Sequence, residues 1–192
     1  MENSEDIDGN GNIRQLSDQL EDAALFRGLE TDERETLLRI MVVNKFSADD
    51  VIVRQEIITR DIWMLMEGEC EVIKQPPIGE LGSPVLLAQL HPFDVFGEMT
   101  VISSEPHVAS VEAKSDVQTL RLRGADFDQL IDSNPRLACR LACNLVRILS
   151  ERLRCVDEKL SRSLDGHEEL KTHQAWQELR GRLGKLYAGS PM

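Results

Sequence analysis

Basic residues are scarce in this chain. Its 192 residues include 22 Lys and Arg against 34 Asp and Glu, which gives a formal net charge of −12 at pH 7. Binding to phosphate backbones or to anionic lipid depends on basic side chains that neutralise charge. Neither DNA nor a membrane is therefore expected as a partner. The 28 residues that follow Leu164 (192 − 164) are also too few for an appended helix-turn-helix reader.

Long hydrophobic runs are also absent, and cysteine is infrequent. No apolar stretch approaches the length of about 18 residues that a membrane-spanning helix needs, and no apolar signal segment opens the chain. The four cysteines show no metal-ligand spacing, and Cys139 and Cys143, one helical turn apart, are expected in a core. This pattern is typical of a reduced, cytoplasmic protein without a metal site.

The chain has no recognisable catalytic motif. Its four histidines, at positions 91, 107, 167 and 173, form no His-x-His pair, which argues against a metal-dependent enzyme on a cupin barrel. Neither a Gly-x-Gly-x-x-Gly loop nor a Gly-x-Ser-x-Gly nucleophile motif is present. We therefore expect a protein that is not an enzyme, with no catalytic residues and no resident cofactor.

What the chain does have is a series of short apolar segments. Between Val42 and Leu122, β-branched and apolar stretches alternate with turn residues, and prolines at 76, 77, 84 and 92 separate them. This predicts a mainly β fold with flanking helices, namely an antiparallel jelly-roll barrel of the cupin-like, double-stranded β-helix type. The expected strands are Val42–Phe46, Val51–Arg54, Ile62–Met66, Glu69–Lys74, Val85–Leu90, Val108–Ala113 and Val117–Leu122.

Helical periodicity flanks this region. Thr31 to Met41 predicts an N-terminal helix, residues around Phe127 predict a short helix, and Pro135 begins a long C-terminal helix. The predicted organisation is a disordered acidic leader over 1–15, a barrel domain over 16–134, the long helix over 135–165 and an amphipathic helical tail over 166–192.

The most informative stretch is residues 96–111. Phe96-Gly97-Glu98 places a glycine where backbone must come close to a ligand, beside a carboxylate that can accept a hydrogen bond from a hydroxyl. After a short turn, Pro106-His107-Val108-Ala109 presents consecutive backbone N–H groups of the kind that bind phosphate. The segment therefore predicts an anion-binding loop.

This segment resembles the phosphate-binding cassette of the cyclic nucleotide-binding domain family, in which Phe-Gly-Glu-Leu precedes a turn and Pro-Arg-Ser/Thr-Ala-Thr-Val. The resemblance implies that Glu98 takes the ribose hydroxyl of cAMP or cGMP, while the family's phosphate-pairing arginine falls on His107. Imidazole, with a reference pKa of about 6.5, cannot reproduce the permanent charge and bidentate geometry of guanidinium at neutral pH. The ligand-binding positions implied are Gly97, Glu98, Met99, His107, Val108 and Ala109.

The resemblance covers about residues 24–160. Ala24–Leu29 and the helix after it resemble the family's opening, and Trp63–Val72 resembles its strand-turn-strand with Gly68 at the bend. The turn before that strand departs from the family. Two glycines are usual there, whereas this chain has Glu56-Ile57-Ile58-Thr59-Arg60, so the usual glycine turn is not predicted.

Apolar residues recur at steps of three or four along the long helix. In the family the corresponding helix covers the nucleotide base and pairs with its twin, so the resemblance implies a homodimer here. A helix packed only on its own domain is the alternative. The positions assigned to the dimer seam are Leu141, Leu145, Leu149, Leu153, Val156 and Leu160.

The resemblance implies a dimeric regulatory domain in which a bound cyclic nucleotide biases the long helix and presents or hides a surface for a protein partner. A scaffold that keeps the barrel for dimerisation and protein interaction, and binds no nucleotide, is the alternative. A third interpretation is a cavity that accepts another small acidic or neutral ligand. The variant His107→Arg discriminates between the first two.

Overall fold

The computed structural model of the protein describes residues 3–6, 10–77, 81–103 and 105–164. Contacts divide the chain into two compact units, residues 1–148 and 149–192. The helical tail expected over 166–192 lies outside the described residues. Within the described ranges, no helix combines the length and the apolar character needed to cross a bilayer.

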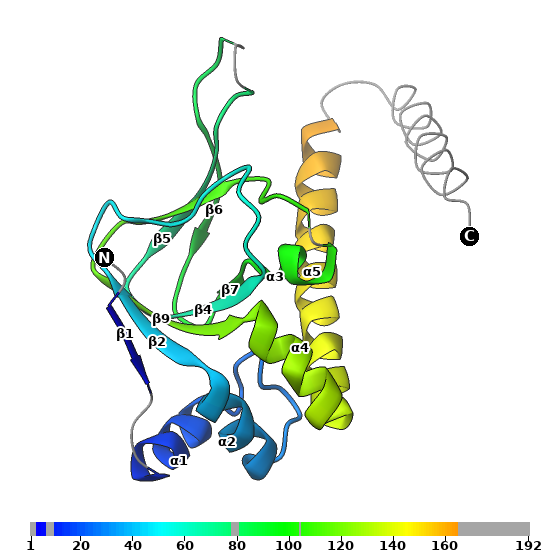
Figure 1. Cartoon of the computed structure of the whole chain (residues 1–192). Helices are drawn as coiled ribbons and strands as arrows, with labels where there is room; N and C mark the ends of the chain where they lie inside the picture. Colours follow the sequence, from blue (N-terminus) through cyan, green and yellow to red (C-terminus); the bar gives the residue numbers. More distant parts are fainter. Residues whose placement is uncertain (1–2, 7–9, 78–80, 104, 165–192) are drawn as a thin grey trace. The chain divides into compact units, whose positions relative to one another are not determined.

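Two antiparallel sheets form the body of the first unit (Figure 1). One has the strand order β1-β2-β9-β4-β7, and the other has the order β3-β8-β5-β6. The pairing confirms the predicted mainly β jelly-roll barrel with flanking helices. The strands are β1 (Asn3–Asp6), β2 (Val42–Phe46), β3 (Val51–Val53), β4 (Asp61–Glu67), β5 (Cys70–Lys74), β6 (Val85–Leu90), β7 (Val95–Phe96), β8 (Ser110–Ala113) and β9 (Val117–Arg123).

The helices begin close to the predicted positions. The expected N-terminal, short and long helices are α2 (Thr31–Ile40), α4 (Gly124–Ser133) and α5 (Pro135–Leu164). Near the cassette, two elements were not predicted: the short strand β7 and helix α3 (Glu98–Ser103), which follows after Gly97. Both fall inside the loop assigned to anion binding, so that loop is more ordered than its sequence suggests.

The prediction of a disordered leader over residues 1–15 is wrong for most of its length. Asn3–Asp6 pairs with β2 as strand β1, and Asn10–Gln19 forms helix α1. The composition of α1 is mostly polar, but its two strongly apolar residues both face the core. Ile13 is buried in the core, and Leu16 packs against the same core three residues later.

The five-stranded sheet has two different faces. On the helix face, residues of β4 and β9 pack with α1, α2, α4 and the first half of α5 in a large apolar cluster. On the interior face, the alternate residues of the same strands pack against the four-stranded sheet. The helix face includes Ile62, Met64, Leu120 and Leu122, and the interior face includes Trp63, Leu65 and Val117.

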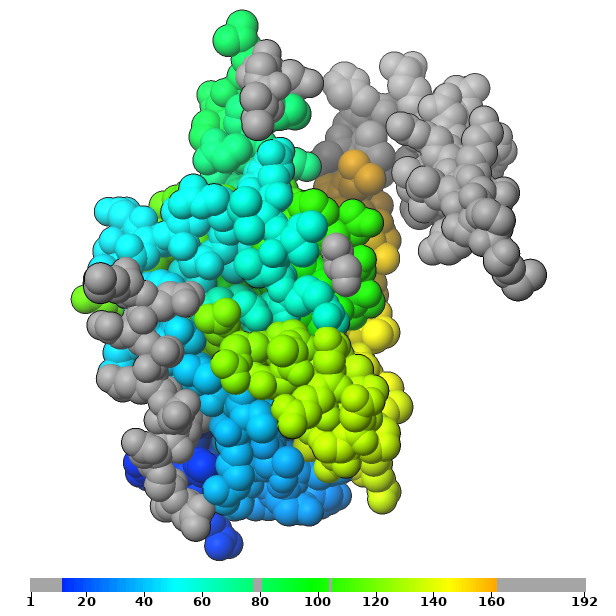
Figure 2. Space-filling model, viewed as in Figure 1, coloured from blue at the N-terminus to red at the C-terminus, as the bar shows by residue number. Residues whose placement is uncertain are grey.

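Strands β5 and β6 continue into a projection from the barrel, as Figure 2 shows. β6 is the edge strand of its sheet, and its residues Val85, Leu86 and Leu87 are all exposed. The projection therefore presents apolar side chains to solvent without contributing to either core.

The apolar stripe of α5 is divided between two environments. Leu141 and Leu145, assigned to a dimer seam, are 0% and 1% exposed within the core of their own unit, so that assignment is wrong for these two. The reason is that the first half of α5 is itself a core helix of the domain. Further along, Leu153, Val156 and Leu160 are 63%, 59% and 53% exposed.

Candidate functional site

Gly97 lies at the junction between β7 and α3 in a conformation that favours glycine. Its φ is +78°, and a Cβ added there would lie 2.5 Å from the Asp61 carbonyl oxygen and 3.0 Å from Trp63 Cδ1. The backbone of Asp61 and the indole of Trp63 leave no room for a side chain. Backbone at Gly97 therefore comes close to β4, and its approach to a ligand stays a prediction.

Helix α3 is fixed to the turn that precedes β4. The hydroxyl of Thr100 lies 2.6 Å from the carbonyl oxygen of Thr59 and 2.9 Å from that of Gly97. Glu98, at the first position of the helix, is only 3% exposed although it is a carboxylate. Buried carboxylates are costly unless they are paired, so this one marks a polar environment inside the fold.

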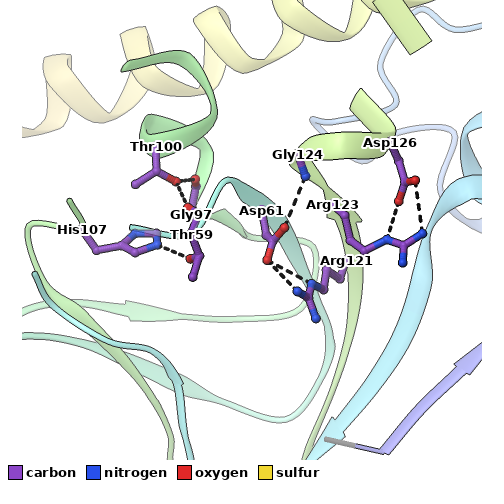
Figure 3. A network of polar contacts seen from close by, with 9 residues as sticks. All are labelled: Thr59, Asp61, Gly97, Thr100, His107, Arg121, Arg123, Gly124 and Asp126. Carbon is purple, nitrogen blue, oxygen red and sulfur yellow. Dashed lines mark hydrogen bonds and ion pairs between the residues drawn. The ribbon is translucent and has the colours of Figure 1, made fainter. Parts of the chain in front are cut away.

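His107 points into the same region. Its Nε2 lies 2.6 Å from the hydroxyl of Thr59, and the residue is 7% exposed (Figure 3). Burial lowers the pKa of His107 below its usual value, while the carboxylate of Asp61, the Thr59 carbonyl and the carboxylate of Glu98 raise the pKa in smaller measure. Because burial has the larger effect, His107 is mostly neutral at neutral pH.

The turn without glycines is held in place by its hydrogen bonds to the cassette (residues 96–111). The Glu56 N–H donates to the His107 carbonyl at 2.8 Å, and the His107 N–H donates to the Ile57 carbonyl at 3.1 Å. Glu56 adopts a φ of +67°, in the left-handed region where one of the family's glycines would be expected. The turn geometry therefore persists with a residue that is strained there.

An ion pair lies beside the cassette on the interior face. Nε and Nη2 of Arg121 donate to the same carboxylate oxygen of Asp61 at 3.1 and 2.8 Å, and the Gly124 N–H donates to the other oxygen at 3.3 Å. The guanidinium carbon of Arg121 also lies 4.9 Å from the centre of the Trp63 ring. Figure 3 places Asp61 between this arginine and the residues Thr59, Gly97 and His107.

The interior face also carries polar atoms without partners. Asn44 is 0% exposed and its side-chain amide has no hydrogen-bond partner among the described residues, and the same is true of Trp63 Nε1. Asn44 pairs with Thr119, which pairs with the interior residue Leu65, so all three side chains share the interior face. Buried polar groups are normally satisfied, so this face is prepared for a polar occupant.

A groove of about 390 Å³ opens on the other side of the Glu56 turn. The side chain of Gln55 fixes its floor by accepting from the N–H of Gln75 at 2.8 Å and donating to its carbonyl at 3.4 Å. The groove is lined in part by Arg54, Glu56 and Glu112. Because its lining carries both signs of charge, this groove is a less favourable site for an anion than the region around the Arg121 guanidinium.

The structure brings most of the predicted site residues together. His107 contacts the turn before β4, Gly97 contacts β4 itself, and Glu98 and Ala109 are buried. The side chains of Met99 and Val108 are 50% and 57% exposed, so only their backbone can serve the site. Sequence reasoning missed Thr59, Asp61 and Arg121. Asp61 begins β4 and Arg121 lies opposite Trp63 on β9, and their contact depends on strand register, which no local motif reports.

No group of three or more His, Cys, Asp or Glu side chains within the described residues is arranged to hold a metal ion.

A family model described as the cyclic nucleotide-binding domain matches residues 43–134. The cAMP-dependent protein kinase regulatory subunit of Blastocladiella emersonii is 30% identical over 112 residues, which is 58% of this chain and 27% of that protein. A second such subunit, from Dictyostelium discoideum, is covered to 35%, so the chain spans about a third or less of these relatives.

Solved structures agree with the fold. The catabolite activator protein of Thermus thermophilus has 28% identity and a TM-score of 0.62, with 72% of this chain and 62% of that chain covered. A cyclic nucleotide-binding domain from Methylobacillus flagellatus has 20% identity and a TM-score of 0.67, with 79% of this chain and 82% of that chain covered. The second likeness, at this identity, concerns the fold alone.

Proposed function

Because residues 43–134 of this chain form a domain of the cyclic nucleotide-binding family, we propose that the domain is a regulatory sensor that takes a cyclic nucleotide, cAMP or cGMP, at the cassette. The affinity is expected to be weak. The relatives named as cAMP-dependent kinase regulatory subunits support a regulatory role, which this chain would exert without chemistry of its own.

The observation that carries the proposal is the backbone at Gly97. A left-handed φ of +78° and the tight approach to Asp61 and Trp63 keep α3 directed as an anion-binding segment needs. Glu98, at the first position of that helix, is 3% exposed. Glu98 remains suited to accept from ribose hydroxyls.

The expected weakness follows from the charges around His107. Its buried ring faces the carboxylates of Asp61 and Glu98, and Arg121 is engaged with Asp61. A neutral imidazole therefore leaves a bound cyclic phosphate without the partner that guanidinium supplies in the family. Losing one member of a desolvated charge pair costs about 2–5 kcal/mol, which is about 30- to 5,000-fold in affinity.

Helix α5 is the element we expect to transmit occupancy. Asp61 binds the N–H of Gly124 at the start of α4, and the Ala138 N–H of α5 donates to the carbonyl of Asn134, the C-cap of α4. The exposed Leu153, Val156 and Leu160 supply an apolar seam for a second copy of the helix. Light scattering on Leu153→Glu tests this seam, because a monomeric variant from a dimeric parent is the expected result.

A scaffold without a ligand is the second candidate, and one observation favours it. The hydrogen bond between His107 and Thr59 satisfies a buried side chain that a ligand would have to compete for. On this alternative the barrel serves dimerisation and protein interaction alone.

Calorimetric titration with cAMP and with cGMP, at pH 6 and pH 8, distinguishes the two candidates. We expect His107→Arg to strengthen binding by at least about 30-fold, and we expect the parent to bind more tightly at pH 6, where more of His107 is protonated. The matched control is His91→Arg, which adds the same charge at an exposed position. Absence of heat from folded parent and folded His107→Arg at both pH values would overturn the cyclic nucleotide proposal.

A further inference from the structure

Position 107 carries no arginine, but strand β9 supplies another one near the cassette, Arg121. Arg121 lies on the interior face of β9, opposite Trp63 of β4, and its guanidinium stacks on the indole ring at 4.9 Å. Its side chain is 23% exposed, so the charge is partly desolvated yet open to a ligand. A guanidinium in this position keeps its charge at every pH of interest.

Asp61 connects this arginine to the cassette. A Cβ on Gly97 would collide with the Asp61 carbonyl, and the Asp61 carboxylate is near enough to act on His107. Arg121 is therefore separated from the cassette by a single residue. Figure 3 shows Asp61 between Arg121 and the His107–Thr59 pair, with its carboxylate oxygens directed to Arg121 and Gly124.

The Asp61–Arg121 pair is built so that its partners can separate. Both Arg121 donors converge on one carboxylate oxygen, and the other oxygen keeps the Gly124 N–H. A phosphate that took the guanidinium would leave Asp61 with that hydrogen bond in place. Phosphate also offers two oxygens in the planar arrangement that a guanidinium prefers, in place of the one oxygen that Asp61 supplies.

An independent observation concerns the buried polar atoms of this face. Trp63 Nε1, on the residue that stacks against Arg121, is buried without a partner among the described residues. The amide of Asn44, on the same face, is in the same state. A polar ligand that reached Arg121 would lie in the region where these donors have nothing to bind.

We propose that Arg121 is the side chain that binds the phosphate of the ligand in this domain, an inference that rests on the proposed function. On binding, the guanidinium leaves the carboxylate of Asp61 and pairs with the phosphate. His107 then acts as a neighbour that tunes the site rather than as the main anion partner. No covalent bond changes, and the guanidinium remains protonated throughout.

The test compares two arginines of one strand. Arg121→Gln removes the interior guanidinium, and Arg123→Gln removes the same charge from an exposed pair with Asp126, two residues further along β9. Binding of cAMP and cGMP is measured by calorimetry at pH 8 in the parent and in a His107→Arg background. Arg121→Lys is included because it keeps the charge if Arg121→Gln fails to fold.

We expect Arg121→Gln to weaken binding by at least about 30-fold, Arg121→Lys to weaken it by about 10-fold because the bidentate contact is lost, and Arg123→Gln to leave it within about twofold. Asp61→Asn should strengthen binding several-fold, since it releases Arg121. Equal losses for the two glutamine variants would reduce the effect to net charge and overturn the proposal. Unchanged binding in folded Arg121→Gln overturns this inference alone, whereas no binding in any protein overturns the proposed function with it.

Discussion

The helix face and the interior face of β4 and β9 share one backbone but differ in chemistry. On the helix face, Ile62, Met64 and Leu122 are each 0% exposed and have only apolar neighbours in the core. On the interior face, Trp63 and Arg121 bring an indole N–H and a guanidinium between the two sheets. Successive side chains of a strand point to opposite faces, so one set of residues packs in the core and the other set presents polar groups on the interior face.

The difference teaches that stability and recognition are separable in this domain. Helix-face residues gain from burial alone and tolerate no polar atom. Interior residues such as Asn44 remain buried with polar atoms unsatisfied, which reduces stability relative to an apolar residue of the same shape. Substitutions on the two faces should therefore affect different measurements.

The largest effect is expected from Leu122→Ala on the helix face. Truncating this fully buried side chain should lower the free energy of unfolding by about 2–5 kcal/mol, because it removes apolar burial and leaves a cavity. Urea denaturation measures the change. Leu81→Ala, at a fully exposed position outside the proposed dimer seam, is the control and should change stability by less than about 0.5 kcal/mol. A similar loss in both variants would contradict the packing described for this face.

Gly97→Ala should cause the second-largest loss of stability. The left-handed backbone alone costs about 1–2 kcal/mol for a residue with a side chain, and here the new Cβ would also meet the backbone of Asp61. Gly28→Ala isolates the first contribution, because Gly28 has a φ of +72° with nothing within 4 Å of the added atom. Thermal or urea denaturation should find Gly97→Ala clearly the less stable of the two, and equal losses would argue against the close approach.

Asn44→Leu, on the interior face, should raise the stability of the folded protein rather than lower it. Replacing a buried amide without partners by an apolar group of similar shape is expected to stabilise the folded protein by about 1 kcal/mol in urea denaturation. If the interior of the barrel is functional, the same variant should bind cyclic nucleotide less well. A loss of stability instead would indicate that the amide is satisfied in solution.

The smallest effect concerns pH. Burial lowers the pKa of His107 on folding, so the unfolded chain binds its proton more readily, and the parent should lose stability as the pH falls from about 6.5 through the lower folded value. His107→Gln should remove this part of the pH dependence, and His91→Gln, at an exposed site, should retain it. Unfolding at pH 5, 6, 7 and 8 measures both, and parallel curves for parent and His107→Gln would refute the assignment.

Local sequence pattern predicted the parts of the fold that depend on local properties. The strands β2 and β6 match their predicted bounds, because short apolar or β-branched stretches next to turn residues or proline define them. Helix α5 begins at Pro135 as expected, since proline suits the first turn. The leader was misjudged because two apolar residues, Ile13 and Leu16, are too weak a signal against a polar background.

The site was predictable only where a motif carries it. Gly97 and Glu98 are recognisable from the cassette, and the replacement of arginine at His107 is visible in the sequence alone. The partners Thr59, Asp61 and Arg121 were not predictable, because their contacts bridge 48 to 60 residues of chain. Such contacts depend on strand register and sheet closure, which single-sequence patterns do not specify.

The pairing of β2 with β9 has a consequence for how this chain is made. Val42–Phe46 pairs with Val117–Arg121 and has no other partner in its sheet except β1. Synthesis proceeds at about 5–20 residues per second, so a nascent β2 waits several seconds before its partner leaves the ribosome. During that interval the apolar strands have neither sheet nor helices to cover them, and the barrel can close only late. Slow, chaperone-dependent maturation is the expected cost of joining the first long strand to the last.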